Sequence, residues 1–287
     1  MPIFDTHCHY NLDPLVDMPD VYLKAAQQAG VAGAVVVGTN TYSNREALRL
    51  RQKYPDYFRA SLGLHPENVE ELWHHNGQNV EQTRRALASE LSELATVMSI
   101  TEFDAWGEIG LDFFHADKKS GDFATLKQLQ LELLQSQLKL ARADERPIIL
   151  HVRDQDLDVD SSESAYHLIL QTIKEMKLEQ KTLIFHCFSG SEAYLKQVLE
   201  LPHAYVSFAG NLTFKSAHEL RALVKMVPAE RLLLETDAPF LSPEPCRGQF
   251  CQPEFIKHTA ELAHEQLGVD LEQVYRNSVA IFGENKL

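Results

Sequence analysis

The chain has 287 residues, of which 44% are hydrophobic and 24% are charged, a composition typical of a globular protein and not of a disordered one. Its formal net charge of −14 excludes broad electrostatic adhesion to nucleic acid, so any phosphodiester would have to be held locally, through cations in a cleft. The sequence contains no apolar run long enough to span a membrane, and its first residues do not resemble a signal peptide, which predicts a cytoplasmic protein.

Short apolar runs alternate with longer segments of helical periodicity, and no linker rich in Pro, Gly and Ser interrupts the alternation. The predicted strands are residues 3–9, 33–39, 58–65, 105–112, 147–153, 181–188, 204–210 and 231–237. A helical segment follows each strand, for example residues 126–143, where leucines recur on one face. A ninth helix is expected at residues 271–282.

The strands are uniformly apolar, as in Ala34-Val35-Val36-Val37, which is typical of parallel sheets covered by helices on both faces. Eight repeats of strand and helix predict an α/β fold, a single (β/α)8 TIM-type barrel that spans residues 1–287 and carries an extra C-terminal helix. The competing doubly wound sheet needs a Gly-rich phosphate turn after its first strand, and that turn is absent from this sequence.

Side chains that can bind a metal or a phosphate stand at the ends of most predicted strands. Barrel enzymes place their active sites at the C-terminal ends of the strands, so we expect these side chains to meet in one mouth. They are His7, His9, His65, Glu108, Asp112, His151, Arg153, His186, Glu235 and Asp237.

His7 and His9 are two positions apart, so on a strand both imidazoles project to the same face and can bind one cation. Cys8 then points the other way. The same alternation predicts that Cys187 packs outward beside an inward-pointing His186, which argues against a sulfur-coordinated metal site. All four cysteines, including Cys246 and Cys251, are expected to be free thiols.

Each of these residues also has a structural interpretation. A lone histidine at a strand end is more often a hydrogen-bonded structural residue than a ligand, and Asp237 could cap a helix, although Ala238-Pro239 makes an immediate helix start less natural. Glu108 on a barrel strand is costly unless it is paired or binds a metal. Glu235 could contact a ligand or pair with Arg153, and the sequence leaves both interpretations open. Eight further histidines are expected at the surface: His74, His75, His115, His167, His203, His218, His258 and His264.

At these residues the chain resembles the TatD family of metal-dependent deoxyribonucleases, within the amidohydrolase-like barrel superfamily. The motifs that carry the resemblance are Phe4-Asp5-Thr6-His7-Cys8-His9, Gly63-Leu64-His65-Pro66, Gly107-Glu108-Ile109-Gly110-Leu111-Asp112, Pro147-Ile148-Ile149-Leu150-His151, His186-Cys187-Phe188-Ser189-Gly190, Leu234-Glu235-Thr236-Asp237-Ala238-Pro239 and Asn277.

The resemblance implies a set of metal ligands in which Glu108 bridges two cations, and it places His65 near the substrate phosphate. The implied ligands are His7, His9, Glu108, His151, His186 and Asp237. One loop departs from the family pattern Arg-Gly-Lys-x-Asn-x-Pro, because here it reads Arg247-Gly248-Gln249-Phe250-Cys251-Gln252-Pro253. Since that loop borders the mouth, the resemblance does not extend to substrate specificity.

We therefore expect a divalent-metal-dependent hydrolase that cleaves DNA phosphodiester bonds as a 3'-5' exonuclease on single-stranded ends, with two cations that could be Mg, Mn or Zn. One cation would be held by His7, His9, Glu108 and Asp237, and the other by Glu108, His151 and His186. The expected catalytic residues are Asp237 as general base, His65 and Glu108, and the expected substrate-binding residues are His65, Arg153 and Asp112.

Two other functions fit the same residues. A small-molecule amidohydrolase or lactonase could use the ligands to polarise a carbonyl, although family resemblance would then lead us to expect a bridging lysine. A non-catalytic binding protein would leave many polar groups in an unused mouth, at a cost in stability. We expect DNA as the substrate partner, no membrane association, no stable protein partner and a monomer.

Overall fold

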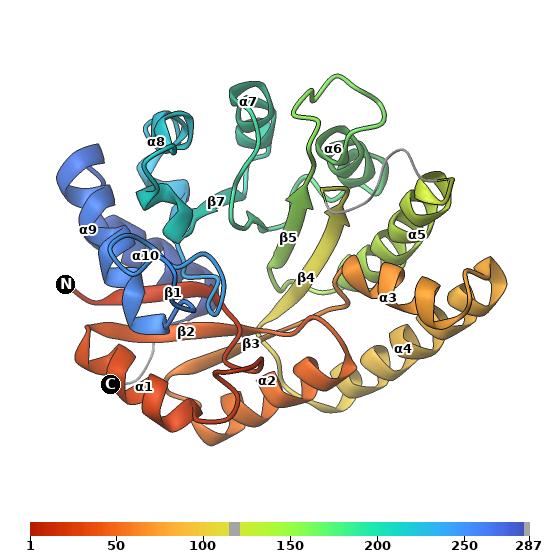
Figure 1. Cartoon of the computed structure of the whole chain (residues 1–287), viewed down its shortest axis with the longest axis horizontal. Coiled ribbons are helices and arrows are strands. Elements are labelled where there is room, and N and C mark those ends of the chain that lie inside the picture. The colour runs from red at the N-terminus through yellow and green to blue at the C-terminus, as the bar shows by residue number, and fades with distance from the viewer. Residues whose placement is uncertain (115–120, 284–287) are drawn as a thin grey trace.

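A computed structural model describes residues 1–114 and 121–283 of the chain. Its eight strands are all parallel and follow one another around the sheet in chain order, which confirms the predicted barrel. Figure 1 shows the helices arranged around the outside of the strands. The strands are β1 (Ile3–Cys8), β2 (Val31–Val37), β3 (Phe58–Leu62), β4 (Ala105–Asp112), β5 (Ile148–Arg153), β6 (Leu183–Phe185), β7 (Ala204–Phe208) and β8 (Leu232–Leu234).

Ten α-helices lie among the described residues, because two helices connect β3 to β4 and two follow β8. No helix in this described part of the chain is both long and apolar enough to cross a membrane. The helices are α1 (Pro19–Gln28), α2 (Thr41–Lys53), α3 (Glu67–His75), α4 (Val80–Ile100), α5 (Phe123–Ala141), α6 (Ala165–Glu175), α7 (Glu192–Glu200), α8 (His218–Val224), α9 (Ile256–Leu267) and α10 (Leu271–Phe282), with the short 3-10 helices η1 (Gly210–Thr213), η2 (Ala229–Arg231) and η3 (Pro253–Phe255).

The bottom of the barrel is filled by apolar side chains from inside the strands and from α10. Phe282 of α10 stacks on Phe4 of β1 with ring centroids 5.9 Å apart, within a buried cluster to which several other strands contribute. Asn277 anchors the same helix, because its side-chain amide donates to the carbonyl oxygens of Ala229 and Leu232 at 2.7 and 2.9 Å. Asn277, which belongs to the family motifs, therefore has a structural role. The packed bottom leaves the opposite end of the barrel for a ligand.

The barrel closes between β8 and β1. Side-chain hydrogen bonds contribute more to this closure than a regular ladder of backbone hydrogen bonds does. Thr236 donates its backbone N–H and its hydroxyl to the buried carboxylate of Asp5, at 3.0 and 2.6 Å, and Thr6 donates to the carbonyl oxygen of Leu234 at 3.0 Å. The Thr236 hydroxyl also accepts the N–H of Ala238 at 3.0 Å. These bonds hold two motif-bearing segments together, more than two hundred residues apart in the chain.

Replacing Thr236 by valine is expected to destabilise the barrel by about 1–3 kcal/mol at nearly unchanged volume, because it removes the hydroxyl that donates to Oδ2 of Asp5 and that accepts the buried N–H of Ala238. Urea unfolding should show a lower midpoint with an unchanged slope. Thr96→Val is the matched control, since Thr96 is exposed on α4 and bonds only within its own helix. Equal midpoints for the two variants would contradict this account of the seam.

Candidate metal centre

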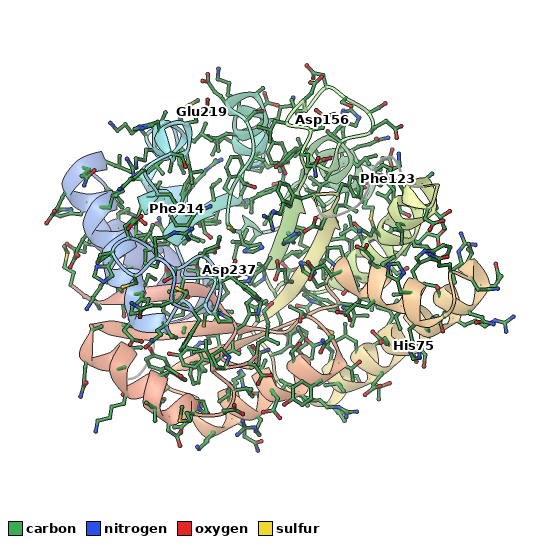
Figure 2. The ribbon with its side chains drawn as sticks, in the orientation of Figure 1. His75, Phe123, Asp156, Phe214, Glu219 and Asp237 are labelled. Atoms are coloured by element: carbon green, nitrogen blue, oxygen red, sulfur yellow. The ribbon has the colours of Figure 1, made fainter. Side chains whose placement is uncertain are left out.

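The predicted site residues do converge on the C-terminal mouth of the barrel. Figure 2 shows Asp237 near the middle of the molecule, whereas His75, Asp156 and Glu219 lie toward its periphery. The mouth contains a cavity of about 590 Å³. It is lined by His9, His65, Glu108, Asp112, His151, Arg153, His186 and Asp237, among other residues.

One oxygen of Glu108 faces the two histidines of the first motif and Asp237. The Nε2 atoms of His7 and His9 are 3.2 Å apart, and they lie 3.3 and 3.8 Å from Oε2 of Glu108. Oδ1 of Asp237 completes the group, 3.8 Å from Nε2 of His7 and 3.4 Å from Nε2 of His9. Ligands around a tetrahedral cation are separated by roughly 3.4 Å when each bond is about 2.1 Å. The spacing of these four atoms therefore suits a single cation between them.

The other oxygen of Glu108 faces two further imidazoles. Oε1 lies 2.6 Å from Nδ1 of His151 and 2.6 Å from Nε2 of His186, and these two nitrogens are 3.2 Å apart. Glu108 can adopt this position because Gly107 precedes it with a φ of +144°, and a side chain there would meet the neighbouring strand. One buried carboxylate thus joins two nitrogen-rich clusters.

Hydrogen bonds on the far side of the ring fix the orientation of His9, His151 and His186. Nδ1 of His9 lies 2.9 Å from the carbonyl oxygen of Val37, and Nε2 of His151 lies 3.0 Å from Oδ2 of Asp112. Such partners set the tautomer of a metal-binding histidine and raise its basicity. Asp112, expected to bind substrate, is placed by the structure against His151 as well as at the cavity wall.

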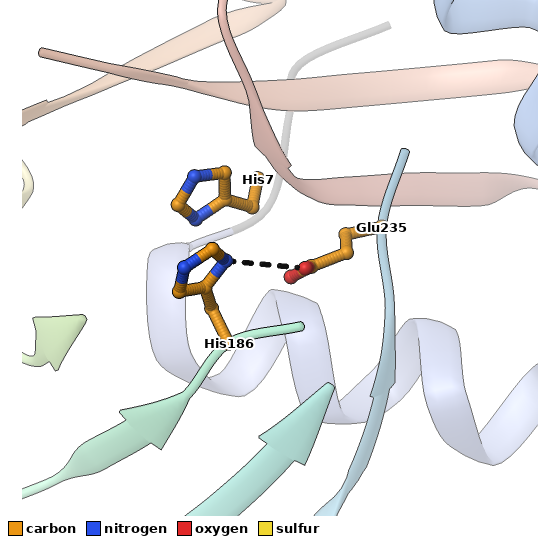
Figure 3. A group of neighbouring side chains, drawn as sticks. All are labelled: His7, His186 and Glu235. Atoms are coloured by element: carbon orange, nitrogen blue, oxygen red, sulfur yellow. Dashed lines mark hydrogen bonds and ion pairs between the residues drawn. The ribbon is translucent and has the colours of Figure 1, made fainter. Parts of the chain in front are cut away.

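Glu235 plays the same part for His186 (Figure 3). Its fully buried carboxylate lies 3.3 Å from Nδ1 of His186, accepts the backbone N–H of Cys187 at 2.8 Å and accepts the hydroxyl of Ser207. The ring of His186 in turn stacks on that of His7, with centroids 3.9 Å apart. Glu235 therefore faces a histidine, and it does not make the ion pair with Arg153 that the sequence left open.

The charges of the cluster suit a cation. Burial by itself raises the pKa of Glu108, but the neighbouring imidazoles, led by His186, hold it well below its usual value. Burial lowers the pKa of His151, yet its hydrogen bonds to Asp112 and Glu108 raise it to about 9. Burial likewise lowers the pKa of His186, and the charge of Glu108 outweighs it and holds the pKa well above normal. Protons on these rings offset the negative charge of the buried Glu108 carboxylate. A divalent cation bound to the neutral rings would offset the same charge.

His65 is set apart from the other imidazoles by its hydrogen bonding. The backbone N–H of Glu67 donates to its Nδ1 at 3.2 Å, so the proton of the neutral ring resides on Nε2. That Nε2 lies 3.5 Å from Oε1 of Glu108. A ring in this tautomer presents a hydrogen-bond donor to the cavity and not a lone pair.

The chain is similar to known proteins over nearly its whole length. The family model described as "TatD related DNase" matches residues 4–284. The chain belongs to the TatD family. An uncharacterised metal-dependent hydrolase of Bacillus subtilis, YabD, is 33% identical over 275 residues, which cover 95% of this chain and 94% of the relative.

Two other matches bear on activity and structure. A protein of Erwinia tasmaniensis named 3'-5' ssDNA/RNA exonuclease TatD is 30% identical over 247 residues, 84% of this chain and 83% of its own. The crystal structure of YjjV, a TatD homologue of Escherichia coli K12, is 28% identical, covers 98% of this chain and 97% of its own, and superposes with a TM-score of 0.74. This TatD-family protein is a metal-dependent hydrolase.

The predicted position of Cys187 in the TatD-family protein is wrong. Strand β6 ends at Phe185, and Cys187 adopts a φ of +44°, so the alternation of an extended strand does not reach it. Its side chain lines the cavity and does not pack outward against a helix. Asp237 and Leu241, with φ of +56° and +52°, are two more cavity-lining residues in this sparsely populated conformation. The four cysteines are free, as expected.

The remaining histidines mostly follow expectation. Five of them are exposed, while His167 and His258 are half-buried. His167 lies 3.1 Å through Nδ1 from the carbonyl oxygen of Val159, and it thereby anchors the loop that precedes its own helix. His115 lies outside the described residues. The five exposed histidines are His74, His75, His203, His218 and His264.

Three residues at or behind the site carried no signal in the sequence. Ser207 lies on β7 behind Glu235, and Asn211 and Phe240 line the cavity. Serine, asparagine and phenylalanine are common in loops and strands, so no residue type or spacing marks these three. Only their position in the folded barrel distinguishes them.

Proposed function

We propose that this protein is a divalent-metal-dependent nuclease that removes nucleotides from single-stranded DNA ends in the 3'-5' direction. The observation that carries the proposal is the position of Glu108, whose two oxygens each face a pair of imidazoles. Paired cation sites that share a carboxylate suit phosphodiester hydrolysis, because charge develops on both the attacking and the leaving oxygen. Relatives named as 3'-5' ssDNA/RNA exonucleases support the choice of substrate.

The residues would divide between two cations as their atoms are grouped. A divalent cation at such a site lowers the pKa of water and offsets negative charge on the phosphate. The first group is His7, His9, Glu108 and Asp237, and the second is Glu108, His151 and His186.

Residues at the rim of these clusters supply the proton transfers and the phosphate contacts. Asp237 reaches the cavity, and its pKa, which burial by itself raises, is held below its usual value by His9, so it is ionised and can accept the proton of the attacking water. His65 presents Nε2–H to the phosphate or the leaving oxygen. Arg153 stacks on the ring of Phe114 at 4.2 Å, which presents its guanidinium at the cavity wall for a phosphate oxygen.

The shape and charge of the mouth favour a strand end over an internal duplex segment. The cavity lies within the range of about 300–1,000 Å³ that is usual for small-ligand pockets, and the barrel beneath it is packed. Arg153 is the only lysine or arginine among the described residues that line it. The net charge of −14 disfavours broad electrostatic contact between a long polyanion and the rest of the protein.

The test uses single-stranded DNA labelled at either end, incubated with metal-stripped protein and then with added Mg²⁺, Mn²⁺ or Zn²⁺. We expect a ladder that shortens from the 3' end only when a metal is added. The exposed acidic residues Glu67 and Glu71 at the mouth favour a second candidate, hydrolysis of an uncharged lactone or amide. Turnover of such substrates without DNA cleavage would replace the nuclease proposal.

Glu235→Gln is expected to weaken metal binding about tenfold while the protein remains folded, because glutamine keeps the hydrogen bonds to Cys187 and Ser207 but removes the charge that makes His186 more basic. Competition with a chromogenic chelator measures the affinity. Ser207→Ala, which leaves the charge in place, should change it less. An equal or larger effect of Ser207→Ala would show that packing, and not the charge of Glu235, sets the affinity.

A further inference from the structure

The two sides of the mouth differ in chemical character. Glu67 and Glu71 of α3, which follows β3, line one side, and Asn211, Phe240 and Leu241, which follow β7 and β8, line another. Because the eight strands follow one another around the barrel in chain order, the segments after β3 and after β7 lie across the mouth from each other. The acidic side repels an anionic ligand. Asn211, Phe240 and Leu241 carry no charge, so their side of the mouth does not repel a nucleotide.

Phe240 leaves much of its ring uncovered beside the reaction centre. It is 52% exposed although it lines the cavity. Its ring stands edge-on to that of His9 at 5.9 Å, and its backbone N–H donates to the carbonyl oxygen of Asp237 at 2.8 Å. An aromatic ring held at this place offers a face on which a planar base can stack.

Asn211 provides a polar group on the same wall. Its Oδ1 is buried and has no hydrogen-bond partner among the described residues. The η1 helix that carries it packs against the segment of Phe240, since a side chain on Gly210 would overlap the carbonyl oxygen of Leu241 and the hydroxyl of Thr213 accepts the N–H of Glu244 at 2.8 Å. A buried acceptor without a partner is costly, and a ligand N–H would satisfy it.

We propose that Phe240 and Asn211 form a subsite for the base of the terminal nucleotide. The ring of Phe240 stacks on the base. The side-chain amide of Asn211 turns toward the edge of the base, where Oδ1 accepts a hydrogen bond from an amino or imino group. The subsite rests on the proposed nuclease function, because it adds base recognition to the same cavity. It recognises the base by its plane and by one hydrogen bond, so it tolerates different bases.

The stacking is tested by comparing the wild type and Phe240→Ala on two oligonucleotide substrates. One oligonucleotide ends in a normal 3' nucleotide and the other in an abasic tetrahydrofuran unit. We expect Phe240→Ala to lower kcat/KM about tenfold on the normal end and hardly at all on the abasic end, with recovery in Phe240→Trp. Phe250→Ala is the control, since Phe250 is 39% exposed in the same loop and does not line the cavity. Equal losses on the two ends, or no loss on either, would overturn the subsite.

Binding separates this proposal from the nuclease proposal. Calorimetry with the Mn²⁺-loaded protein compares dAMP with 2-deoxyribose 5-phosphate. We expect the wild type to prefer dAMP about tenfold, and Phe240→Ala and Asn211→Ala to reduce that preference without changing the affinity for the sugar phosphate. Equal affinities in the wild type would overturn the subsite even if DNA is cleaved. A preference for dAMP without cleavage of DNA would support the subsite and refute the nuclease.

Discussion

Glu108→Gln is expected to abolish hydrolysis, with a loss of roughly 10³-fold or more in kcat/KM, and to reduce the bound metal. The substitution keeps the shape of the side chain but removes the charge that both imidazole pairs share. Glu235 lies near His7 and His186, but the oxygens of Glu108 approach all four imidazoles to within 3.8 Å. Neither cation site therefore keeps its full set of ligands in the variant. Elemental analysis of the purified protein measures the metal, and the cleavage assay measures the activity.

Thermal unfolding distinguishes lost metal binding from a lost fold. Added metal stabilises a protein that binds it in the native state, so the Tm of the wild type should rise with metal and that of Glu108→Gln should not. Glu71→Gln removes a glutamate from the same mouth without touching the clusters, and it should behave as the wild type does. A Glu108→Gln protein with wild-type metal content would show that this carboxylate is not the shared ligand.

The sequence predicted the barrel well because its strands are buried on both faces and its repeats are regular. Alternation also placed His7 and His9 on the same face, where their Nε2 atoms lie 3.2 Å apart. The same rule failed at Cys187, since β6 ends two residues earlier and the backbone turns to a φ of +44°. Alternation reports side-chain direction only while the chain stays extended.

Half of the predicted strand-end residues lie beyond their strands. Tertiary hydrogen bonds position them, such as the backbone N–H of Asp237 to the carbonyl oxygen of His7 at 2.9 Å and that of His65 to Thr39 at 2.8 Å. No local pattern encodes such contacts between distant segments. The same reason explains why the sequence could not assign a partner to Glu235. Its partner, His186, is about fifty positions away, and a carboxylate can pair with a cation as well as with an imidazole. The residues beyond the strands are His9, His65, His186, Glu235 and Asp237.

Asp237→Asn is expected to lower kcat by about 10³-fold while the protein remains folded. Asp237 has a φ of +56°, a left-handed conformation that asparagine adopts as readily as aspartate, so the backbone of the mouth should be preserved. What is lost is the charge beside His7 and His9 and the ability to accept a proton from water. Single-turnover cleavage at saturating metal isolates the proton transfer from weakened metal binding.

The backbone argument is tested by Asp237→Ala. Alanine is disfavoured in the left-handed region, so this variant should lose activity as Asp237→Asn does and should also unfold more easily, by about 1–2 kcal/mol. Urea unfolding of the metal-free proteins compares the two, which removes any stabilisation by bound metal. Equal stability of the two variants would mean that Asp237 is not held in a strained conformation. Activity retained in Asp237→Asn would mean that another group accepts the proton, and His65, whose Nδ1 already accepts the N–H of Glu67, is poorly placed to do so.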